Sequence, residues 1–262
     1  MAKPLAEHMN NTLGFKMNTL LGNNATKKNL SDSLVHASPA LVYSASHGIG
    51  APNESFETQK RFNGAICCQK VAGTQLIDNL FTAADIPSGD DSFLEGSIFF
   101  QFACFGYGTP AQSDFSHWVN GTSEFNSKCD FISALPKRLL AHPKGPIVYI
   151  GHIDAAWLHG FEDPKNPYIL EKWDPRIAPF VYAIDTLLQD TNPVGPAMAE
   201  MNKRFNLCNA VLTSALDRLQ RNKTPMTPEF YGRLADTFIS RSDAQNYLVF
   251  GDPAARPRIK TQ

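Results

Sequence analysis

The most strongly strand-forming segment of the chain reads Gly96-Ser-Ile-Phe-Phe-Gln-Phe-Ala-Cys104, and it stops at the glycine-rich run Phe105-Gly-Tyr-Gly-Thr-Pro110. β-Branched and aromatic residues favour strands, and clustered glycine and proline end them. A second run, Ala40-Leu-Val-Tyr-Ser-Ala-Ser46, is short and mostly apolar, as in a buried parallel strand, and is followed by His47-Gly48. Cys104 and His47 are therefore each expected at the carboxyl end of a strand.

Strand-like and helical segments alternate along the rest of the chain. Further strands are expected at 64–69, 146–151 and 247–250, and helices at 24–36, 74–83, 128–142, 180–189, 196–221 and 228–241. This alternation predicts an α/β fold with a mostly parallel sheet and helices on both faces. Because ligands bind beyond the carboxyl ends of such strands, the loops at 47, 104 and 152–157 are expected to meet at one edge.

Length and composition describe an enzyme-sized globular protein. Of 262 residues, 43% are apolar and 19% charged, and 24 basic residues nearly balance 25 acidic ones. No long-range field would therefore attract nucleic acid or an anionic membrane. No segment reaches the roughly 18 apolar residues of a membrane span, and residues 1–14 lack a signal-peptide core. Five cysteines without paired spacing fit a reducing compartment, so a cytoplasmic location is expected.

The residue types at the two strand ends suit nucleophilic catalysis. A thiol attacks a carbonyl as its thiolate, and an imidazole can take the thiol proton and pass it to a leaving group. The backbone amides of Gly48 and Cys104 are candidates for holding the oxyanion of a tetrahedral intermediate. The alternative for either residue alone is a role in core packing, which is common for single cysteines and histidines.

The motifs around these two residues resemble the clan that unites caspases, gingipains, clostripain, separase and CHAT-domain proteases. The matching runs are Val42-Tyr-Ser-Ala-Ser-His-Gly48 and Phe99-Phe-Gln-Phe-Ala-Cys104. The run Gln101-Phe-Ala-Cys-Phe-Gly106 is similar to the caspase signature but has one extra residue before Ala103. Asn24-Ala-Thr-Lys27 and Tyr247-Leu-Val-Phe-Gly-Asp-Pro-Ala254 are similar to segments of the gingipain-like and CHAT-domain branches.

The resemblance implies a caspase-like three-layer fold, with residues 1–262 as a single peptidase domain. It implies a cysteine endopeptidase in which His47 protonates the leaving amine and Cys104 forms the acyl-enzyme, with Gly48 and Cys104 as oxyanion donors. The implied partner is a protein or peptide substrate, and no metal or organic cofactor is needed. The substrate cleft is expected at Asp154 and Trp157.

Substrate preference follows less directly from the resemblance. In several branches that cleave after basic residues, an acid stands two positions before the nucleophile, where this chain has Phe102. Phe102 is therefore assigned to the substrate site without an acidic role. Asp154 is the expected partner of a basic side chain at the P1 position, just before the cleaved bond, and Asp114 is the competing acid.

Three alternatives remain open at this point. Folds of this clan usually begin with a strand well before the His-Gly strand, and only residues 15–21 offer one here. Either the chain lacks an N-terminal strand because it is a piece of a longer protein, with a regulatory domain elsewhere, or the domain starts unusually late. A catalytically silent scaffold or interaction module of the same fold is the alternative function. An unrelated α/β hydrolase is disfavoured because no Gly-x-Ser-x-Gly or phosphate-loop motif is present.

Overall fold

A four-stranded sheet forms the centre of the molecule in the computed structural model, which describes residues 2–35, 39–51, 53–89, 92–116, 127–160, 175–189, 192–221 and 227–259. Its strand order is β1-β4-β7-β8, formed by Leu41–Ala45, Ile98–Phe102, Val148–His152 and Tyr247–Gly251. The first three strands are parallel, and β8 is antiparallel to β7. The fold is therefore α/β with a mixed, mostly parallel sheet, as the alternation of segments predicts.

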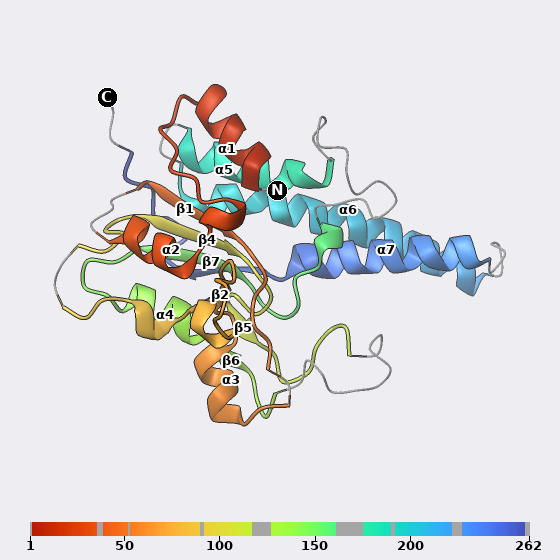
Figure 1. Ribbon diagram of the computed structural model, residues 1–262. Helices are drawn as coiled ribbons and strands as arrows, with labels where there is room; N and C mark the ends of the chain where they lie inside the picture. The colour runs from red at the N-terminus through yellow and green to blue at the C-terminus, as the bar shows by residue number, and fades with distance from the viewer. Residues whose placement is uncertain are drawn as a thin grey trace.

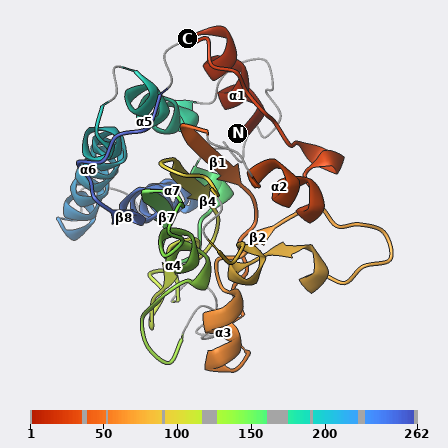
Figure 2. The same cartoon turned by 90° about the vertical axis from the view of Figure 1, so that its left-hand side faces the viewer.

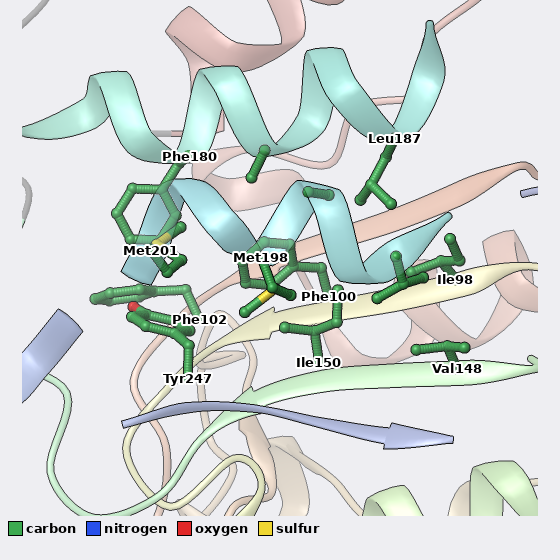
Figure 3. Close-up of a cluster of buried hydrophobic side chains, with 13 residues drawn as sticks. Ile98, Phe100, Phe102, Val148, Ile150, Phe180, Leu187, Met198, Met201 and Tyr247 are labelled. Carbon is green, nitrogen blue, oxygen red and sulfur yellow. The ribbon is translucent and has the colours of Figure 1, made fainter. Parts of the chain in front are cut away.

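One face of the sheet is covered by α5 (Ala178–Leu188) and α6 (Val194–Gln220), as Figures 1 and 2 show. Because strand side chains alternate between faces, every second residue of β4 points to these helices. Figure 3 shows the resulting cluster, in which Phe100 and Phe102 meet Phe180 of α5. Its other buried members are Ile98, Val148, Ile150, Ala183, Leu187, Val194, Ala197, Met198, Met201 and Tyr247.

The opposite face packs against α2 (Lys27–Leu34) and α4 (Ala134–Leu140). Phe99 of β4 stacks on Tyr149 of β7, with ring centroids 5.5 Å apart. Gln101, also buried on this face, accepts a hydrogen bond from the Tyr149 hydroxyl and donates one to the Gly64 carbonyl at 3.0 Å. Helices thus cover both faces of the sheet, as expected.

The remaining elements surround this three-layer centre. α1 (Ala2–Asn11) packs against α5 through Leu5 and Met9, and α7 (Pro228–Gln245) lies beside α6 in a pair that extends away from the sheet (Figure 1). The smaller elements are α3 (Phe56–Phe62), the hairpin of β2 (Ile66–Cys67) with β3 (Leu80–Phe81), the pair β5 (Gly108–Thr109) and β6 (Phe131–Ile132), and 3-10 turns at Gly22–Asn24, Ile77–Asn79, Ala83–Asp85, Leu158–Gly160 and Pro175–Ile177.

The predicted helix at 74–83 is wrong, because this segment forms a 3-10 turn followed by the short strand β3. Asn79 explains the difference. Its side chain accepts a hydrogen bond from the Val71 amide at 3.1 Å and donates to the Thr74 hydroxyl at 2.7 Å and to the Gln75 carbonyl at 2.6 Å. Such local side-chain bonds compete with helical backbone bonds.

Three other expectations need correction. The strand expected at 64–69 is reduced to β2, which pairs with β3 outside the main sheet. The helix expected at 128–142 begins only at Ala134, so that Pro136 lies in its first turn, where a missing amide hydrogen costs little. Residues 15–21 form no strand. α1 and α3 were not predicted, because α1 buries only Leu5 and Met9 and α3 is only 7 residues long.

Candidate active site

The register of β1 and β4 brings His47 next to Cys104. The last pair of the ladder joins Ala45 to Phe102, and the Ser46 amide extends it by donating to the Phe102 carbonyl at 3.1 Å. Continuing this register by two residues sets His47 beside Cys104, on strands that are about 5 Å apart. The two residue types that the sequence analysis paired therefore follow neighbouring strands at the same level.

The backbone of Gly48 lies directly against that of Cys104. A Cβ atom placed on Gly48 would lie 1.9 Å from the Cys104 carbonyl oxygen and 2.8 Å from its amide nitrogen. The loop is held in this position by β2, because the Cys67 amide donates to the His47 carbonyl at 3.1 Å and Gly48 forms a bridge with Ile66. Only a residue without a side chain fits at position 48.

Alternation along the two strands, continued two residues past their ends at Ala45 and Phe102, predicts that the side chains of both candidate residues lie on the α5–α6 side of the sheet. Phe102 and Tyr43 point to that side, and Cys104 and His47 follow at even spacing. His47 is exposed and Cys104 is half-buried. Both residues are therefore at least partly open to solvent on neighbouring loops.

The Cys104 thiol is held in its protonated form. Its Sγ atom donates a hydrogen bond to the Ala156 carbonyl oxygen at 3.4 Å. Burial is the largest cause that raises the pKa of Cys104, and the carboxylate of Asp243 adds to it, whereas backbone hydrogen bonds of Ala156, Gly48 and Cys104 itself lower the pKa. The net pKa is raised, so the sulfur needs a base to become a nucleophile.

The loop after Cys104 is bonded to the loop after β7. The Phe105 amide donates to the Asp154 carbonyl at 2.7 Å, and the Tyr107 amide donates to the His152 carbonyl at 2.9 Å. Phe105 and Asp154 both have positive φ angles, 57° and 73°, which are uncommon for residues other than glycine. The three loops at 47, 104 and 152–157 therefore meet at one edge, as the strand ends predicted.

The Asp154 carboxylate is engaged by neighbouring donors. Oδ2 accepts from the Ser113 hydroxyl at 2.8 Å and from the Asp114 amide at 2.9 Å, and Oδ1 accepts from the Ala155 amide at 2.8 Å. The side chain is 2% exposed, and burial raises its pKa while these hydrogen bonds act in the opposite direction. These contacts brace the loop, and a pairing of Asp154 with a basic substrate side chain stays a prediction.

Phe102 and Trp157 lie in different surroundings. Phe102 is 4% exposed and packs on Phe180 and Tyr247 in the core (Figure 3), so its ring is largely covered by these side chains. Trp157 is half-buried and meets Phe115 edge to face at 5.4 Å between ring centroids. Of these two residues, only Trp157 has a partly accessible ring near the Cys104 loop.

Sequence reasoning missed a buried polar cluster behind Cys104. It consists of His152 at the end of β7, Asp243 of α7 and Arg204 of α6. Asp243 and Arg204 belong to helices that follow the strand-end motifs by many residues, and their spacing matches no motif. The only available signal was His152, which was read as part of a loop.

Metal binding and membrane insertion find no support in the described part of the chain. No group of three or more histidine, cysteine or acidic side chains is arranged there to hold a metal ion, and none of the helices there combines the length and apolar character that crossing a bilayer requires. Comparison of the chain with protein families, with curated proteins and with solved structures found no match.

Proposed function

We propose that the protein is a cysteine endopeptidase with a caspase-like fold, in which His47 and Cys104 form the catalytic dyad. The observation that carries this proposal is the contact of Gly48 with the Cys104 backbone, which brings the histidine loop against the nucleophile loop. The strand register supports it, because His47 and Cys104 follow adjacent parallel strands. The substrate would be a protein or peptide.

The raised pKa of Cys104 determines the first step of the reaction. His47 takes the thiol proton as Sγ attacks the carbonyl carbon of the scissile bond, and the new C–S bond gives a tetrahedral intermediate. The amides of Gly48 and Cys104 donate to its oxyanion. The C–N bond then breaks, and His47 gives its proton to the leaving amine. In the second stage His47 takes a proton from water, which attacks the acyl-enzyme. The C–S bond breaks, the acid product leaves, and His47 returns the proton to the sulfur.

The exposed imidazole and half-buried sulfur suit an extended substrate that lies over the sheet edge. Trp157, with its ring against Phe115, is placed to contact substrate residues near the cleaved bond. The Asp154 carboxylate already has three hydrogen-bond donors, so it contributes to the substrate site by holding the loop that carries Ala156 and Trp157.

A fluorogenic peptide library tests the proposal. The native chain is expected to cleave a subset of peptides, iodoacetamide to abolish cleavage, and Cys104→Ala and His47→Ala to lower kcat/KM by at least about 1,000-fold. Cys129→Ala is the matched control, because this free cysteine is exposed and is expected to leave the rate unchanged. Cleavage that persists in Cys104→Ala would exclude the dyad. Failure of the native chain on every peptide would favour the silent scaffold.

A further inference from the structure

Asp243 is the centre of a buried charged cluster. Its side chain is fully buried, its Oδ2 atom lies 3.2 Å from Nη1 of Arg204, and its Oδ1 atom lies 3.4 Å from Nε2 of His152. Position 160 is a glycine, and a Cβ there would come within 2.3 Å of the Asp243 carboxylate. The cluster therefore joins α6, α7, β7 and the turn at Leu158–Gly160.

This cluster is connected to the nucleophile through the loop that follows β7. Nδ1 of His152 lies 3.3 Å from the carbonyl oxygen of Asp154, and that same oxygen accepts the Phe105 amide hydrogen at 2.7 Å. Further along the loop, the Ala156 carbonyl accepts from the Cys104 thiol at 3.4 Å. Both contacts of the Cys104 segment thus depend on where His152 holds this loop.

Stability alone does not require charges at this position. Removing two charges from water costs about as much free energy as their pairing returns, and well-packed apolar side chains usually serve the core equally well. An ion pair that is fixed near a reactive sulfur contributes an electrostatic potential at that sulfur, which apolar side chains do not. Asp243 disfavours a negative sulfur, and the positive charge of Arg204, 3.2 Å from the Asp243 carboxylate, acts in the opposite direction by Coulomb's law.

We propose that Asp243 is a positioning residue for Cys104: held by Arg204, it fixes His152 and the loop after β7, and together the two charges set how readily the sulfur reacts. The proposal rests on the assigned role of Cys104 as nucleophile. Its readout is the chemistry of the sulfur itself, so it can be tested without a peptide substrate.

Other ionisable groups lie around the sulfur or around the charged cluster and its neighbours, and they have to stay constant in the test. They come from β1 and its loop, β2, β7 and its loop, α6 and β8, and they are Tyr43, His47, Cys67, His152, Asp154, Cys208 and Tyr247. None of them is changed in the variants below. A difference between variants therefore reports on the altered charge and on the loop that it holds.

The experiment measures the rate of iodoacetamide alkylation at Cys104 against pH, followed by peptide mass spectrometry on the full chain. At pH 7, Asp243→Asn is expected to react at least about threefold faster, and Arg204→Gln at least about threefold more slowly, because thiolate is the reactive form. The double variant is expected to lie between them. Asp217→Asn, an exposed acid of α6 paired with Arg221, is the matched control and should leave the profile unchanged.

A merely structural role predicts a different result. Loosening of the fold would speed alkylation in both single variants, and that outcome, like an unchanged profile in both, would overturn the proposal. If circular dichroism shows that either single variant does not fold, Arg204→Lys is tested instead. This variant keeps the positive charge and is expected to retain the native profile of alkylation rate against pH. A clear shift of that profile would also overturn the proposal. If peptide cleavage is absent while the opposite shifts are found, the peptidase assignment fails and the positioning role stands.

Discussion

Replacing Gly48 with alanine should displace the backbone of Cys104, the proposed nucleophile. The new Cβ would lie 1.9 Å from the Cys104 carbonyl oxygen, whereas real Cβ atoms essentially never approach within 3.0 Å, so the two loops must separate by about 1 Å. A displacement of that size at a reacting atom lowers the rate by about 100-fold. We also expect a loss of about 1–3 kcal/mol in the free energy of unfolding, as for an overpacked core.

The assay compares kcat/KM on the best peptide and the urea midpoint of Gly48→Ala with those of the native chain. Gly232→Ala is the matched control, because Gly232 lies in α7 and a Cβ there meets nothing within 4 Å. This control should gain about 1 kcal/mol of stability and keep its activity, since alanine is the better helix former. Native turnover in Gly48→Ala would refute the close contact of the two loops.

Two half-buried thiols, a buried carboxylate and a buried hydroxyl give three further predictions. Burial raises the pKa of Cys67 and of Cys68 to about 11, so both thiols stay neutral in the folded chain at a pH where unfolded thiols ionise. The free energy of unfolding, measured by urea titration at several pH values, should therefore fall between about pH 8.5 and 11. The fall should be less steep in a Cys67→Ala/Cys68→Ala variant. Asp154→Asn should lose about 1–3 kcal/mol in the same titration and, if its carboxylate only holds the loop, reduce turnover of all peptides alike; a loss confined to peptides with Lys or Arg at P1 would instead support the pairing of Asp154 with a basic substrate side chain. Ser133→Ala removes the buried hydroxyl that donates to the Phe105 carbonyl at 2.6 Å, so thermal melting should report about 1–2 kcal/mol less stability, and an unchanged melting curve would contradict this.

The centre of the main sheet could be predicted from the sequence because β4 and β7 are buried on both faces. A run such as 98–102 is almost wholly apolar, and its glycine-rich continuation marks the end. The segment at 74–83 also has apolar residues at helical spacing. The Asn79 side chain, however, forms hydrogen bonds with the Thr74 hydroxyl and the Gln75 carbonyl that compete with the backbone bonds of a helix. Periodicity records which residues are buried and does not record such competing polar contacts.

The site was predictable only where it follows from strand ends. His47 and Cys104 could be predicted to lie at the same edge of the sheet, because the carboxyl ends of parallel strands lie at one edge. The partners of Asp154 could not, since Ser113 lies in a loop and a hydrogen bond between two loops leaves no periodic signal. Asp243 was equally hidden, because an acid on a helix is normally read as solvent-exposed.

The left-handed backbone at Phe105 has a consequence for engineering. A phenylalanine held at a φ of 57° costs the folded chain roughly 1 kcal/mol or more, but its ring is buried, and removing a buried phenylalanine ring costs about 3–5 kcal/mol. Directed evolution for heat resistance would therefore tend to keep Phe105 and reject Phe105→Gly. Heat-resistant variants of this scaffold are thus expected to carry their substitutions outside this loop.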